Sequence, residues 1–387
     1  MNYLSYQIEH LQSKGGFSTA KEISNQPDLW NETYSKLLGE KDEILKFIQK
    51  FQKEDKPNVI LTGAGTSAFI GEVLEGPMQR KWGIPCRAIA TTDIVTHPEN
   101  YFIPSGTTLL ISFARSGDSP ESLHAVRLAK KHCNKLYELN ITCNAEGNLA
   151  KDISGENYCL FLLPEESNDR SLVMTSSFSS MLLSGLLIMN IHVLEQMSPI
   201  ISRLSEIGEY ILRSYLIGIK KIAESDFERM VFLGSGPLFG IAHESHMKVQ
   251  EMTNGQVICK FESFLGLRHG PRIVINGATV IVYLLSSNIH ARQYELDLVR
   301  SVELTATNEK SVIIGNGYDE KEFRCDLAIK FPSETDDIPE EFSSLPYILP
   351  AQIIGFYKSL HLGLSPDSPS TNNVISRVVQ GVKIYHK

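Results

Sequence analysis

The chain has 387 residues, of which 42% are hydrophobic and 21% charged, so it is long and apolar enough to form two globular domains of ordinary size. A formal net charge of −8 at pH 7 argues against a nucleic-acid-binding surface, although it leaves room for a local basic pocket. The first residues, MNYLSYQIEH, lack the basic and then apolar pattern of a signal peptide, and the six cysteines form no CxxC pair. We therefore expect a cytoplasmic protein with free, mostly buried thiols.

Residues 1–56 predict an N-terminal helical arm, because apolar side chains recur at helical spacing through its second half. Thr19 and Glu22 have the spacing of a capping box. Pro27 suits the first turn of a new helix.

Short apolar runs between residues 57 and 200 predict a first α/β domain. The expected strands cover 59–61, 86–90, 107–113, 136–142 and 159–163, and the expected helices cover 69–82 and 120–133. Near-continuous apolar strands separated by helices are typical of a parallel, doubly wound sheet of the flavodoxin type.

The second half of the chain repeats this order at an offset of about 170 residues. The segments 231–236, 278–284, 311–315 and 327–331 mirror four of the five strands expected in the first half. The sequence therefore predicts two tandem copies of one domain, over 57–200 and 201–364, followed by a C-terminal tail, 365–387.

One segment, 171–196, is strongly apolar, and Glu195 is its only formally charged residue. Several serines and His192 interrupt it. The pattern favours a helix buried on most sides, or one shared with a second subunit, over a membrane span. We therefore expect no membrane partner and a homodimer or higher homo-oligomer.

The turn after the first strand of the first repeat is rich in small residues. Gly63, Gly65, Thr66 and Ser67 lie between an apolar strand and the start of a helical pattern. Glycines allow close approach of the backbone, and free N–H groups with the helix dipole favour an anion. The alternative is an ordinary turn between a strand and a helix, with no ligand.

A second loop follows the strand TTLLISF and opens another helix. Ser116 and Ser119 offer hydroxyl groups there, Gly117 allows close approach and Arg115 offers a cation. Ligands of open α/β sheets bind at this edge of the sheet. The simpler interpretation is a helix cap, with Asp118 or Ser119 as the capping residue, and both interpretations can hold together.

A charged stripe marks the helix that follows the glycine turn of the second repeat. Glu244, Lys248 and Glu251 are four and three residues apart and therefore share a helix face. From this spacing alone, a solvated salt-bridge stripe is the favoured interpretation.

The motif GAGTS, followed by SxxRSGDSPES about fifty residues later, resembles the sugar isomerase (SIS) domain, whose members bind phosphosugars through a loop of the form S-x-S-G-x-[ST]. Ala114 stands where that loop often has a serine. Two tandem SIS domains resemble the isomerase half of glucosamine-6-phosphate synthase. With the motifs T-A-K-E-I, Q-P-D-L-W, L-R-H-G-P, S-P-D-S-P and R-V-V-Q-G-V, most of the chain resembles the AgaS proteins, which are galactosamine-6-phosphate deaminases or tagatose-6-phosphate ketose/aldose isomerases.

The resemblance implies that the phosphate of a sugar is held by the two loops of the first repeat. The residues concerned are Gly65, Thr66 and Ser67 in the first loop and Ser112, Arg115, Ser116, Gly117 and Ser119 at the second.

The resemblance also assigns roles in the second repeat. It implies that Glu251 moves a proton between two sugar carbons and that Lys248 and Glu244 line the same site. His269, next to Arg268 in the motif LRHGP, is implied as the residue that opens the pyranose ring, since an imidazole can donate to the ring oxygen near neutral pH. The alternative for His269 is a turn histidine bonded to the backbone.

Two further features are weaker. His243 and His246 could bind a metal with Glu244, but no third and fourth ligand at metal spacing accompanies them, so we expect no metal and no organic cofactor. The synthase has a C-terminal lysine that reaches its sugar site, and Gln380 stands nearest to that position here. A tail segment packed on a neighbour is the alternative.

The resemblance to the AgaS proteins implies an enzyme that opens galactosamine 6-phosphate, transfers a proton from C2 to C1 and releases ammonia to give tagatose 6-phosphate. Isomerisation of tagatose 6-phosphate without loss of ammonia is the second hypothesis, and a non-catalytic phosphosugar sensor is the third. The sequence does not separate the sugar epimers or their N-acetylated forms.

Overall fold

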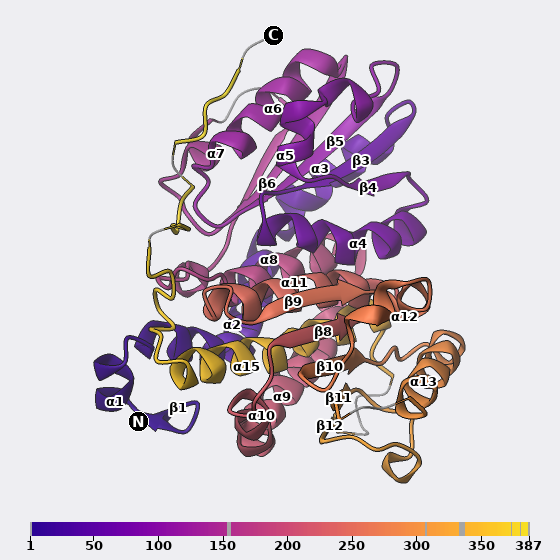
Figure 1. Cartoon of the computed structure of the whole chain (residues 1–387). Coiled ribbons are helices and arrows are strands. Elements are labelled where there is room, and N and C mark those ends of the chain that lie inside the picture. Colours follow the sequence, from indigo (N-terminus) through magenta and orange to yellow (C-terminus); the bar gives the residue numbers. More distant parts are fainter. Residues whose placement is uncertain are drawn as a thin grey trace. The chain divides into compact units, whose positions relative to one another are not determined.

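The computed structural model of the protein describes residues 2–152, 156–305, 308–332, 337–372, 374–379 and 381–385, which form two compact units (Figure 1). The first unit contains residues 28–169, 176–201 and 375–387, and the second contains residues 1–27, 170–175 and 202–374. Each unit is built around one five-stranded sheet.

The N-terminal region is helical, as predicted, and a short hairpin precedes it. The strands β1 (Asn2–Tyr3) and β2 (Tyr6–Gln7) pair antiparallel, and α1 (Ile8–Ser13), α2 (Phe17–Gly39) and α3 (Lys41–Gln52) follow. The sequence patterns do not indicate the hairpin.

Two predicted helix starts in this region are wrong. Pro27 lies inside α2, and the carbonyl of Ile23, which cannot accept an N–H from Pro27, accepts the side-chain amide of Gln26 at 3.3 Å instead. Thr19 and Glu22 do not form a capping box, because Thr19 lies within α2 and donates its N–H and its hydroxyl to Asp367, both at 2.8 Å. Thr19 bonds to a residue far away in the sequence, so local spacing does not predict where the helix begins.

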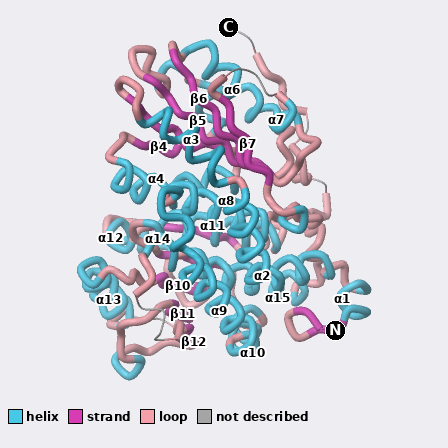
Figure 2. The backbone as a smooth tube through the Cα atoms, turned by 180° about the vertical axis from the view of Figure 1, so that it is seen from behind, coloured by secondary structure: helices cyan, strands magenta, loops and turns pink. Residues whose placement is uncertain are grey.

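The sheet of the first unit is parallel throughout and has the order β4-β3-β5-β6-β7. All five predicted strands are confirmed, within a few residues at their ends. They are β3 (Pro57–Thr62), β4 (Cys86–Ala88), β5 (Thr107–Ala114), β6 (Lys135–Thr142) and β7 (Tyr158–Leu162). Helices α4 (Thr66–Trp82), α5 (Thr91–Thr96), α6 (Pro120–His132) and α7 (Asn148–Lys151) lie between them along the chain. Figure 2 shows α4, α6 and α7 with the strands of this sheet.

The sheet of the second unit repeats the strand order of the first, and its strands are again all parallel. It comprises β8 (Arg229–Leu233), β9 (Ile258–Glu262), β10 (Thr279–Leu284), β11 (Lys310–Ile314) and β12 (Leu327–Ile329), in the order β9-β8-β10-β11-β12. The four predicted strands are confirmed. The fifth, β9, escaped prediction because it is an edge strand with charged residues in alternation and with Ile258 exposed.

The main helices of the second unit are α10 (Leu216–Ala223), α11 (Pro237–Met252), α12 (Phe264–Leu267), α13 (Ile289–Glu303), α14 (Glu340–Ser343) and α15 (Ile348–His361). One long helix, α9 (Ser198–Ser214), begins in the first unit and ends in the second. The two repeated α/β sheets confirm the predicted fold class.

The apolar segment of the first unit forms α8 (Ser176–Met189), in which every residue is buried, as predicted. It packs on α4, where a Cβ atom added to Gly185 would come within 2.3 Å of a methyl group of Leu74. Among the residues that the structure describes, no single helix is both long and apolar enough to cross a membrane. The bent pair formed by α8 and the segment Ile191–Ser214 has the length and composition of a membrane span, by these two criteria alone. The six cysteines are free, and five of them are buried.

Candidate functional site

The strand order reverses direction between the two central strands of each sheet, which is where open α/β sheets bind ligands. In the first unit these strands are β3 and β5, and Thr62 pairs with Ser112 at their carboxyl ends. The two loops predicted to bind phosphate therefore leave neighbouring strands at the same edge of the sheet.

The glycine turn after β3 needs both of its glycines. Gly65 has a φ of 56°, in the region that favours glycine, and α4 begins directly after it at Thr66. A Cβ atom added to Gly63 would lie 2.5 Å from the carbonyl carbon of Ser67. Thr66 and Ser67 are both buried in the first turn of α4, and the N-terminus of this helix lies at the same edge of the sheet.

The loop after β5 contains the predicted helix cap. Ser119 Oγ accepts the N–H of Ser122 in the first turn of α6, and Ser116 Oγ accepts the N–H of Asp118 at 3.2 Å. Gly117 has a φ of 71°. Asp118 is not the cap, since its carboxylate accepts the N–H of Asn148 at 2.9 Å. The loop is thus held in a fixed conformation by its own hydroxyl groups.

Arg115 is almost fully buried, and its guanidinium donates to the carbonyl oxygen of Arg377 at 2.7 Å. Arg377 in turn donates to the carbonyl oxygen of Asp169 at 2.9 Å and to the side chain of Asn168 at 2.5 Å. The carboxylate of Asp169 accepts the N–H groups of Ser176 and Ser177 at the start of α8. Sequence reasoning assigned no role to Arg377 or Asp169, because each acts on a segment distant in sequence. Gln380 lies outside the described residues.

The second unit brings Glu244, Lys248 and Glu251 together on α11, as their spacing predicted. Lys248 Nζ lies 3.3 Å from Glu244 Oε1 and 2.9 Å from Glu251 Oε2. The interpretation as a solvated stripe is wrong, because Glu244 and Lys248 are completely buried. Burial opposes the charge of Lys248, but the two carboxylates outweigh it and raise the pKa of this lysine.

Glu251 is the member of this cluster that reaches solvent, with 26% of its side chain exposed. Its Oε2 is held by Lys248, while its Oε1 makes no hydrogen bond within the described part of the chain. One carboxylate oxygen is therefore oriented by a buried cation, and the other is available to a ligand.

His269 lies at the surface, in the turn between α12 and Pro271–Val274. Its backbone N–H donates to Gly266, Gly270 follows it with a φ of 114°, and Arg268 pairs with Asp297 at 2.8 Å. Among the described residues, no hydrogen bond, ion pair or ring contact joins His269 to the cluster around Lys248. The structure therefore places these predicted site residues in one unit but not in contact.

The two histidines of α11 are not arranged as a metal site. The ring of His243 stacks on Phe261 with centroids 3.8 Å apart, and His246 Nδ1 bonds to the carbonyl oxygen of His243. Burial lowers the pKa of His246 to about 4. Of the residues with described positions, no three His, Cys, Asp or Glu side chains are grouped in a way that could hold a metal ion.

The structure has the features expected of a tandem sugar-isomerase-type protein: two parallel sheets of the same strand order, a turn of glycine, threonine and serine at one reversal point, and the Glu–Lys–Glu cluster on α11. No family model matches the sequence. D-galactosamine-6-phosphate deaminase AgaS of Shewanella sp. (strain ANA-3) is 39% identical over 381 residues, which cover 97% of this chain and 94% of that protein. The chain belongs to the AgaS family.

Two other relatives agree with this assignment. A crystal structure from Clostridium novyi NT, named as a tagatose-6-phosphate ketose/aldose isomerase, is 41% identical, with a TM-score of 0.93 and complete coverage of both chains. Glutamine–fructose-6-phosphate aminotransferase of Methanothermobacter thermautotrophicus is 25% identical over 373 residues, covering 93% of this chain and 57% of that enzyme. The second match confirms the resemblance to one part of such synthases.

Proposed function

We propose that the protein converts galactosamine 6-phosphate to tagatose 6-phosphate and ammonia. The names of its relatives support this class of substrate, and one observation on the chain itself supports the chemistry. Glu251 is a partly exposed carboxylate held 2.9 Å from a completely buried lysine, which is a suitable arrangement for a general base with a fixed orientation.

The phosphate group would be bound at the carboxyl ends of β3 and β5. This edge of the sheet carries the N-terminus of α4, the hydroxyl groups of Ser67, Ser116 and Ser119, and the cation of Arg115. These groups would bind the part of the substrate that does not react.

The reaction would begin with ring opening, in which His269 donates a proton to the ring oxygen and the C1 hydroxyl loses its proton to give the open-chain aldehyde. Glu251 would then remove the proton from C2 while the C1 carbonyl oxygen gains one, which forms a carbon–carbon double bond between C1 and C2. Return of the proton to C1 gives an imine at C2. Water adds to this imine, the carbon–nitrogen bond breaks, and ketose phosphate and ammonia leave.

The direct test is ammonia release by the purified protein from galactosamine 6-phosphate, with glucosamine 6-phosphate alongside. We expect Glu251→Gln to lower the rate by about a hundredfold or more, because the amide keeps the shape of the side chain but cannot accept the proton. The matched control is Glu209→Gln, which changes an exposed glutamate on α9 and should leave the rate unchanged. Equal rates for the wild type and Glu251→Gln would remove Glu251 from the mechanism.

Isomerisation without ammonia loss is the second candidate, and the similarity to the Clostridium novyi protein, which is named as an isomerase, favours it. It uses the same proton transfer between C1 and C2. This candidate would be selected if a C1 proton of tagatose 6-phosphate exchanges with solvent in a preparation that releases no ammonia from either amino sugar.

We further propose that the protein acts as a cytoplasmic homo-oligomer.

A further inference from the structure

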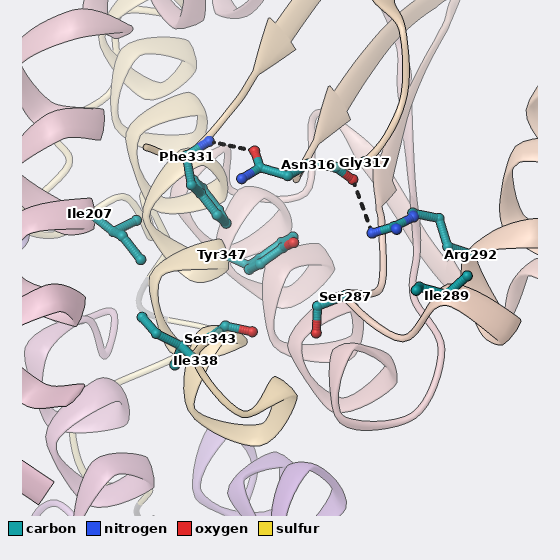
Figure 3. Close-up of a pocket in the computed structure, with 10 residues that line it drawn as sticks. All are labelled: Ile207, Ser287, Ile289, Arg292, Asn316, Gly317, Phe331, Ile338, Ser343 and Tyr347. Carbon is teal, nitrogen blue, oxygen red and sulfur yellow. Dashed lines mark hydrogen bonds between the residues drawn. The ribbon is translucent and has the colours of Figure 1, made fainter. Parts of the chain in front are cut away.

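The second unit contains a cavity of about 240 Å³ at the carboxyl edge of its own sheet. It lies where the chain leaves β10, β11 and β12, between the loops that follow these strands and the segment before α15 (Figure 3). The lining residues that matter are Ser287, Arg292, Gly317, Phe331, Ile338 and Tyr347. None of them belongs to the cluster on α11.

The loop that forms one wall of this cavity is built like the phosphate loop of the first unit. Asn288 donates its N–H to Ser286 Oγ at 3.0 Å, as Asp118 does to Ser116. Asn288 also caps the following helix, α13, as Ser119 caps α6. The two loops follow corresponding strands, β10 and β5, so the repeat has kept the loop geometry although the sequence differs.

Arg292 supplies the positive charge of the cavity. Among the described residues, its guanidinium bonds only to the carbonyl oxygens of Ser286 and Asn316, both at 3.4 Å. It lies against Gly317, where an added Cβ atom would come within 2.2 Å of it. No carboxylate oxygen of the described residues lies within ion-pair distance of it. A guanidinium held in this way keeps most of its donors for an oxyanion.

The opposite wall is apolar and rigid. Phe331 and Tyr347 form a perpendicular ring pair with centroids 4.8 Å apart, and Tyr347 donates its hydroxyl to the carbonyl oxygen of Leu285 at 2.7 Å. Ile207 and Ile338 complete this wall and are buried. Figure 3 shows the two rings on the far side of the cavity from Arg292. Such a wall suits the C–H face of a sugar ring.

Two carboxyl groups near the loop bond to Ser286 and are not among the residues that line the cavity. Glu340 bonds to the Ser286 hydroxyl, and Glu295 Oε2 accepts the Ser286 N–H at 2.8 Å. Burial raises the pKa of Glu295 to about 7.

We propose that this cavity is a second ligand site, which takes a sugar-sized molecule bearing a phosphate or carboxylate group, with the oxyanion on Arg292 and the sugar body against Phe331 and Tyr347. The proposal does not depend on the reaction assigned above, because it uses none of the residues of that reaction.

The test is calorimetric titration of the full chain carrying Glu251→Gln, so that no turnover occurs. The probes are glucose 6-phosphate, gluconate, inorganic phosphate and glucose. We expect Arg292→Gln to weaken one class of binding site for glucose 6-phosphate by about tenfold or more and to leave any other class unchanged. Binding of gluconate at the same class of site shows that a carboxylate suffices, and its absence restricts the site to phosphate. Glucose, without an oxyanion, should not bind there.

Two further variants make the test decisive. Ser287→Leu places an apolar side chain in the cavity from an exposed position and should abolish the same class of site. Arg300→Gln removes a guanidinium from the same helix, outside the cavity, where it pairs with Glu322, and should change nothing. Thermal melting of each variant checks its folding. Binding of glucose 6-phosphate that is insensitive to both Arg292→Gln and Ser287→Leu, or equally tight binding of glucose, would overturn the proposal, as would the absence of binding by every probe.

Discussion

Lys248 is the residue on which the cluster of α11 depends. It is completely buried, as is Glu244, and its ammonium lies within 3.3 Å of carboxylate oxygens on both sides. Without this cation, the carboxylate charge buried beside it would be uncompensated, and burying an uncompensated charge destabilises the folded state.

We therefore predict that Lys248→Met lowers the free energy of unfolding by about 3 to 5 kcal/mol, measured by urea denaturation. Adding Glu244→Gln to this variant should restore part of the loss, because it removes the carboxylate that is left buried. The control is Lys151→Met, which breaks an ion pair with Glu146 whose two side chains are both exposed, and should leave the free energy of unfolding almost unchanged. A loss for Lys248→Met no larger than that of the control would contradict this account.

The position of these residues on one helix face could be predicted from sequence, but their burial could not. Spacing along α11 is a local property. Burial depends on α15, which packs on α11 and carries Gly355, where an added Cβ atom would lie 2.9 Å from the sulfur of Met252 and 3.3 Å from the Lys248 carbonyl oxygen. This close approach between distant helices leaves no periodic pattern in α11 itself.

At the scale of single elements, the start of α2 shows why helix boundaries were predicted less well than strands. Asp367, from the far end of the chain, accepts the N–H groups of Ser18 and Thr19 at 3.2 and 2.8 Å. It therefore acts as the cap of α2 and places a negative charge at its N-terminus. The strands were predicted well because their apolar runs are buried on both faces, which is visible locally.

We predict that Asp367→Ala lowers the free energy of unfolding by about 1 to 2 kcal/mol, since it leaves these N–H groups and the Thr19 hydroxyl without their acceptor. Asp367→Asn should retain part of the stability, because its side-chain carbonyl can still accept a hydrogen bond but carries no charge. Thermal and urea denaturation of both variants measure the difference. If the asparagine variant proves less stable than the alanine variant, Asp367 does not act as a cap.

At the scale of the whole molecule, the repeat explains how the two sheets differ. Both have the same strand order, and in both a loop with a serine and a helix cap follows the central strand. Both units also have a glycine turn after the other strand at the reversal point, with Gly65 at a φ of 56° and Gly236 at a φ of 55°. The two copies differ in the side chains at these loops, since the first turn continues with Thr66 and Ser67, whereas in the second unit Glu295 and Glu340 bond to Ser286.

The assembly of the first unit from separated segments leads to the last prediction. The C-terminal segment around Arg377 belongs to this unit, and its guanidinium donates to Asp169 and Asn168 while its carbonyl oxygen accepts from Arg115 in the phosphate loop. Arg377→Ala removes the two side-chain anchors and leaves the carbonyl, so the segment is no longer fixed beside the loop. We therefore expect KM for the phosphorylated substrate to rise by about tenfold, with a much smaller change in kcat, because phosphate binding is affected and proton transfer on α11 is not. Lys383→Ala, at an exposed position further along the same segment, should leave both constants unchanged. A fall in kcat at unchanged KM would instead mean that this segment acts on the proton-transfer step and not on the phosphate loop.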